Sequence, residues 1–139
     1  MREVRARNER VQQGDLAGAV GDARQRAAAV EAAARRVEDA RAALDTANRA
    51  RDRALAGAAG GVTVATLAHL ERYLGRLRHA LDAALGELSR ARALHRGQLE
   101  AVDAARERLA YARSQRELIE RHFAAWRTER RKLAERRED

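Results

Sequence analysis

A heptad repeat in the second half of the chain limits most strongly what it can fold into. From Leu67 onward, alternate steps of three and four residues reach mostly apolar positions for more than nine heptads. This spacing predicts a helix that packs along one narrow stripe against a partner helix, in a left-handed supercoil. We call the stripe the second-helix seam: Leu67, Leu70, Leu74, Leu77, Leu81, Ala84, Leu88, Ala91, His95, Gln98, Val102, Ala105, Leu109, Ala112, Arg116, Ile119, Phe123, Trp126, Arg130 and Leu133.

A helix over about residues 64–137 would be on the order of 110 Å long, too long to enclose a core of its own. The first half of the chain offers a partner helix over about residues 3–56. Its small side chains would let the two helices approach closely while burying modest area. They form the first-helix seam, which Arg51 interrupts: Leu16, Val20, Ala23, Ala27, Val30, Ala34, Val37, Ala40, Leu44, Ala47 and Ala54.

Glycines mark the weak points of this helical pattern. Gly14, Gly18 and Gly21 each cost a helix about 1 kcal/mol against alanine, so we expect the first helix to be firm from about residue 22 and frayed or kinked before it. A second group lies in the stretch "GAAGGVT" over residues 57–63. Glycine readily ends a helix, and Thr63 is suited to cap the next one. The sequence therefore predicts a turn at residues 57–63.

The resulting fold is an all-α antiparallel coiled-coil hairpin that forms a single domain over residues 1–139. A flexible glycine hinge between two independent helices is the alternative. The composition, with no proline, 36% charged and 3% aromatic residues, is typical of long helices. Disorder is the competing interpretation, and the regular leucine spacing argues against it more strongly in the second half than in the first.

Composition also narrows the class of protein. There is no cysteine for a disulfide or a thiolate metal site,. No apolar run approaches the roughly 20 residues that cross a bilayer, so we expect a soluble, cytosolic protein without direct membrane insertion. The four histidines are scattered, both serines fall inside predicted helix, and no glycine loop has phosphate-binding spacing,. We therefore expect no catalytic residues, no cofactor and no metal site: the chain is not an enzyme.

The charge and the chain ends indicate where partners bind. The net charge of +8 favours acidic partners, such as nucleic acid, an anionic membrane or an acidic protein surface. In the C-terminal "WRTERRKLAERRED", acidic residues interrupt the bases, so we do not expect a phosphate-binding face.

The second helix should overrun the first by roughly 20 residues, over 118–139. That segment holds Phe123 and Trp126 on the seam, and apolar seam residues without an intramolecular partner indicate an intermolecular one.

The stretch "GVTVATLAHLERYLGRL" (residues 61–77) resembles the FliJ/SctO proteins, also called the YscO family. These are small stalk components of flagellar and type III secretion export ATPases. In that family a glycine–aliphatic–threonine loop precedes a helix with an aromatic residue about ten positions later, as Gly61, Val62, Thr63 and Tyr73 do here. The C-terminal "RERLAYARSQRELIERHFAAWRTERRKLAERRED" is similar to the family's basic second-helix end.

The resemblance implies a non-enzymatic two-helix stalk at the cytosolic face of the inner-membrane secretion apparatus. Its partners would be a hexameric export ATPase, the cytosolic domain of the export-gate membrane protein, and secretion chaperones. The gate-facing residues would be Tyr73, Leu77, Ala80 and Ala84, although Ala84 stands where a relative has a larger polar group. The ATPase-facing residues would be Ile119, Phe123, Trp126, Arg127, Arg130, Arg131, Lys132 and Leu133. A basic coiled-coil protein that binds nucleic acid, and a self-assembling structural coiled coil, are the alternatives from other classes.

Overall fold

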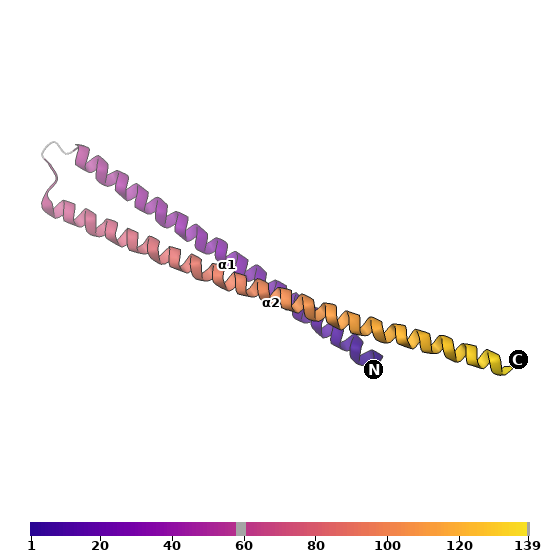
Figure 1. Cartoon of the computed structure of the whole chain (residues 1–139). Helices are drawn as coiled ribbons and strands as arrows, with labels where there is room; N and C mark the ends of the chain where they lie inside the picture. The colour runs from indigo at the N-terminus through magenta and orange to yellow at the C-terminus, as the bar shows by residue number, and fades with distance from the viewer. Residues whose placement is uncertain (58–60, 139) are drawn as a thin grey trace. The chain divides into compact units, whose positions relative to one another are not determined.

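The computed structural model describes residues 1–57 and 61–138, and it contains two long helices (Figure 1). Helix α1 spans Arg2–Gly57 and helix α2 spans Val64–Glu138. The two helices pack antiparallel and α2 is the longer, which confirms the predicted all-α hairpin. Neither helix, over the residues described, has a stretch long and apolar enough to cross a membrane. Contacts divide the hairpin into two units, one of Arg24–Gly97 and one of Met1–Ala23 with Gln98–Asp139.

The unit of Arg24–Gly97 has a core of small and medium side chains. Ala33 and Val37 of α1 pack with Ala84 and Leu88 of α2, and five half-buried apolar residues flank them: Val30, Ala34, Ala40, Leu81 and Ala91. Ion pairs also join the helices. Arg36 Nε lies 3.3 Å from Glu87 Oε2, and Arg51 Nη1 lies 3.6 Å from Glu71 Oε1. The later of the two α1 residues pairs with the earlier of the two α2 residues, as antiparallel packing requires.

The unit of Met1–Ala23 and Gln98–Asp139 buries the next part of the second-helix seam. Val102, Ala105, Leu109 and Ala112 are all buried. A polar contact supplements them, because the Gln98 side-chain amide donates a hydrogen bond of 3.2 Å to the Ala19 carbonyl. Every second-helix seam position from residue 70 to 123 is buried or half-buried across the two units. The predicted 3.5-residue spacing is therefore confirmed over this range.

The first-helix seam is confirmed with one shift. Most of its predicted members are buried or half-buried, but Ala54 is exposed and Ala33 is buried more deeply than the predicted Ala34. Positions 33 and 34 are both alanine, so side-chain size does not determine which of them is buried. The geometry of helix packing determines it.

The start of α2 has the predicted cap. The Thr66 backbone N–H donates a hydrogen bond of 3.2 Å to the Thr63 hydroxyl, and the Leu67 N–H donates one of 3.0 Å to the Thr63 carbonyl. Gly61 has a φ of 77°, a conformation that side chains disfavour,. Gly57 is still helical as the last residue of α1, and residues 58–60 of the predicted turn lie outside the described residues.

Helix α1 is continuous from Arg2, so the expectation that it is frayed before residue 22 is wrong in this structure, and the alternative of a kink there stays a prediction. Contacts with α2 compensate for the poor helix propensity of its glycines. Glu9 contacts Arg113 and Arg116, and the Ala19 carbonyl accepts the bond from Gln98.

Candidate interaction site

The end of α2 holds a stack of aromatic rings and guanidinium groups. The rings of Phe123 and Trp126 have centroids 5.6 Å apart and are inclined by 30°. The guanidinium groups of Arg2 and Arg127 each lie 5.1 Å from the centre of the Phe123 ring, and that of Arg130 lies 5.2 Å from the Trp126 ring. An arginine over an aromatic face contributes about 0.5–1 kcal/mol at an exposed site. We call these five residues the aromatic cluster.

The apolar side chains of this region become more exposed toward the C-terminus. Ile119 and Phe123 are half-buried, whereas Trp126 is 45% exposed and Leu133 is 55% exposed. The expectation that all four lie beyond the reach of the first helix is therefore wrong for Ile119 and Phe123. The reason is that α1 is helical from Arg2, and Arg2 lies over Phe123.

Charged side chains surround the exposed part of the seam. Arg127, Arg130, Arg131 and Lys132 are all exposed. A surface hollow of about 260 Å³ is lined by Glu129, Lys132, Leu133 and Arg136. The arrangement offers apolar contact at Trp126 and Leu133 within a mainly positive border, which suits an acidic partner that also presents apolar side chains.

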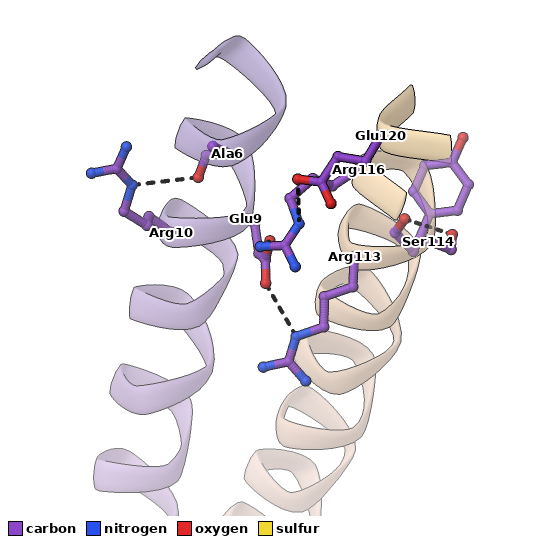
Figure 2. A network of polar contacts seen from close by, with 8 residues as sticks. Ala6, Glu9, Arg10, Arg113, Ser114, Arg116 and Glu120 are labelled. Atoms are coloured by element: carbon purple, nitrogen blue, oxygen red, sulfur yellow. Dashed lines mark hydrogen bonds and ion pairs between the residues drawn. The ribbon is translucent and has the colours of Figure 1, made fainter. Parts of the chain in front are cut away.

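A carboxylate lies between the helices in the same unit (Figure 2). The Arg113 Nε donates a hydrogen bond of 3.3 Å to Glu9 Oε1, and Arg116 Nη1 lies 2.6 Å from Glu9 Oε2. Arg116 Nε also approaches Glu120 Oε1 at 3.7 Å. Among the side chains that the structure describes, Glu9 is the only charged one that is buried, at 5% exposure. A buried carboxylate needs such partners, since losing them leaves an uncompensated charge.

The spacing of apolar residues does not predict Glu9. Steps of three and four back from Leu16 reach Gln12 and Glu9, which are polar, so the apolar first-helix seam begins at Leu16. One signal was available in the other helix. Arg116 interrupts the second-helix seam, and an arginine on a buried stripe calls for a carboxylate opposite it.

The expected gate-facing residues lie along one stripe of α2 but differ in accessibility. Tyr73 is 43% exposed, with the Arg76 guanidinium 5.7 Å from its ring centre. Ala80 is exposed and Leu77 is half-buried. Ala84 belongs to the core with Ala33 and Val37, so in the hairpin it is a packing residue and cannot contribute to an external contact.

Comparison of the chain with protein-family models, characterised proteins and solved structures found no match. The resemblance noted above therefore depends on the residues between Gly61 and Tyr73, the basic end of α2 and the hairpin topology. Within the residues described, no group of three or more His, Asp or Glu side chains gathers as a metal site would require.

Proposed function

We propose that this chain is a non-enzymatic coupling protein of a flagellar or type III secretion export ATPase. In this proposal it lies at the cytosolic face of the inner-membrane secretion apparatus. It links the hexameric ATPase to the cytosolic domain of the export gate and also contacts secretion chaperones. The antiparallel hairpin and the residues Gly61, Val62, Thr63 and Tyr73 support this function, because both agree with the family that the chain resembles.

The observation that carries the proposal is the exposure of Trp126 and Leu133 on the second-helix seam, among arginines. Covering these side chains would contribute several kcal/mol at about 25 cal/mol per Å² of apolar area, of which the entropy lost on association offsets a part. The surrounding cations would steer this end of α2 toward acidic residues of the ATPase ring, so association should slow as salt rises.

We assign the second contact, that with the export gate, to Tyr73, Leu77 and Ala80. Tyr73 supports the assignment best, since its ring is half-exposed beside Arg76. Tyrosine and arginine are enriched among residues that dominate binding at protein interfaces.

The test is a binding assay with the purified cognate export ATPase. The double variant Trp126→Ala/Leu133→Ala should bind about tenfold or more weakly, since truncating a central interface residue costs at least 1–2 kcal/mol. The matched control is Tyr111→Ala/Leu118→Ala, which removes an aromatic and an aliphatic side chain of α2 that are 66% and 62% exposed but lie off the seam. Circular dichroism should show unchanged helicity for both. Equal affinity of the two double variants would refute the placement of the ATPase contact.

The exposed Trp126 and Leu133 also support a second candidate, a structural coiled coil that self-assembles through this segment. A self-assembling chain would show a mass that falls when both residues are replaced by alanine. If the chain is a coupling protein, the same double variant should keep the mass of the unmodified chain and lose its binding to the ATPase.

A further inference from the structure

The first twelve residues of α1, residues 2–13, cover the second-helix seam mainly with polar side chains. We call this segment the strap. Its side chains that are buried or half-buried are those of Arg5, Ala6, Glu9 and Gln12. Its valines point away, because Val4 is 68% exposed and Val11 is 52% exposed. The strap buries apolar side chains of α2, but its own side chains contribute little apolar area to the packing, which is the main favourable contribution when helices pack.

The contacts beneath the strap are polar and few. Glu9 Oε2 is held by its ion pair with Arg116 Nη1, and Arg116 Nε approaches Glu120 Oε1 within its own helix. The strap is therefore fastened to α2 mainly through the one carboxylate of Glu9. A hollow of about 400 Å³ also lies beside this contact, lined by Asn8, Gln12, Glu107, Arg108 and Tyr111.

Three glycines separate the strap from the rest of α1. A Cβ atom added at Gly14, Gly18 or Gly21 would meet nothing within 4 Å, so packing does not require glycine at any of them. Each nevertheless weakens the helix by about 1 kcal/mol against alanine. This segment is therefore where α1 bends or unwinds most easily.

Charge also opposes the closed position of the strap. Residues 2–13 contain four arginines and two glutamates, a formal charge of +2, and residues 109–123 of α2, which the strap covers, carry three basic and two acidic side chains, a formal charge of +1. Glu9, which bridges Arg113 and Arg116, is the contact that offsets this repulsion.

We infer that residues 2–13 form a displaceable strap, held closed by Glu9, which opens at residues 14–21 and uncovers the second-helix seam from Leu109 to Phe123. When the strap opens, the exposed apolar stripe of Trp126 and Leu133 extends back to Leu109 and Ala112. A partner that binds this longer stripe shifts the strap toward the open state. Opening is a property of the free chain and does not depend on the proposed function.

Thiol labelling tests the inference, because the chain has no cysteine of its own. Ala112 lies under the strap at 2% exposure, and Ala33 lies in the other unit at 1%. We expect the thiol of Ala112→Cys to react with a soluble disulfide reagent about tenfold or more faster than that of Ala33→Cys, since local opening requires less free energy than global unfolding. Equal rates would overturn the inference.

Variants of the strap then identify what holds it. Glu9→Gln should raise the labelling rate of Ala112→Cys about tenfold, because it leaves Arg113 and Arg116 without their carboxylate, and should leave Ala33→Cys unchanged. The matched control Glu3→Gln removes the same charge from an exposed position of the same segment and should have little effect. Equal effects of the two substitutions would overturn the role of Glu9.

Replacing the three glycines by alanine should have the opposite effect to Glu9→Gln, because it stabilises the helix where the strap would open. The triple variant Gly14→Ala/Gly18→Ala/Gly21→Ala should slow the labelling of Ala112→Cys, because alanine favours the helix at all three positions. Amide hydrogen exchange of the unmodified chain should show one common opening rate for residues 5–13 with a step across residues 14–21. A smooth gradient of rates from the N-terminus inward would indicate simple fraying and contradict a strap.

Discussion

The aromatic side chains of this protein lie at the borders of the hairpin. Tyr73 and Trp126 are each about half-exposed, Tyr111 is exposed, and Phe123 is half-buried. The core between the helices consists largely of alanine, valine and leucine, and helices that approach over alanine leave no room for a ring. Three of the four rings instead contact arginine side chains, and two of these three, Tyr73 and Trp126, are exposed enough for a partner to reach them.

Tyr73 and Leu74 are neighbours with opposite predicted roles. Tyr73→Ala should lower the free energy of unfolding by less than about 1 kcal/mol, because its ring is 43% exposed,. Leu74→Ala should lower it by about 2–5 kcal/mol, because that side chain is 1% exposed,. Urea denaturation followed by circular dichroism measures both. A loss from Tyr73→Ala as large as that from Leu74→Ala would make Tyr73 a core residue and end its assignment to the export gate.

At the scale of the elements, different polar contacts stabilise the N-terminal ends of the two helices. Helix α2 begins with a side-chain cap at Thr63, and the first turns of α1 depend on Glu9 and its two arginines. Long helices gain most of their stability from the packing of one face, so these polar contacts mainly decide where each helix starts.

The cap at Thr63 yields a direct prediction. Thr63→Ala should lower the free energy of unfolding by about 1 kcal/mol, because the Thr66 N–H loses its acceptor, whereas Thr63→Ser should change it little. Chemical denaturation gives the free energies, and hydrogen exchange at Thr66 reports the cap itself. Unchanged exchange at Thr66 in Thr63→Ala would show that the hydroxyl does not cap α2.

The elements differ in how far sequence predicts them. The second-helix seam was predictable because leucines, at Leu74, Leu81 and Leu88, mark one stripe without ambiguity. The choice between Ala33 and Ala34 was not, because equal side chains leave it to helix geometry. The bounds of α1 were predicted closely, but the ionic contact of Glu9 and the cover that the first turns of α1 give to Phe123 were not. Polar side chains make these contacts, and the spacing of apolar residues gives no information about salt bridges.

At the scale of the whole molecule, charge and exposed apolar residues have opposite effects on the association of identical chains. The net charge of +8 disfavours association of identical chains,, while Trp126 and Leu133 favour it. The end of α2 that carries both residues is itself strongly basic, so repulsion between two copies is concentrated where they would meet.

We therefore expect a monomer. Light scattering at low micromolar concentration and moderate salt should give a mass near 15.4 kDa. A mass of a multiple of this value, which returns to the monomer value in Trp126→Ala/Leu133→Ala, would favour the self-assembling structural protein instead.

The small side chains between the helices also determine how stability responds to temperature. Among the residues described, Leu74 is the only large side chain that is completely buried, and much of the remaining core is alanine. Apolar surface exposed on unfolding sets the heat-capacity change, which averages about 12–15 cal/mol/K per residue in globular proteins. Because this hairpin exposes less apolar surface per residue, its value should be lower and its stability curve flatter. Calorimetry should therefore find a heat-capacity change per residue below this average, with cold denaturation displaced far below the freezing point of water.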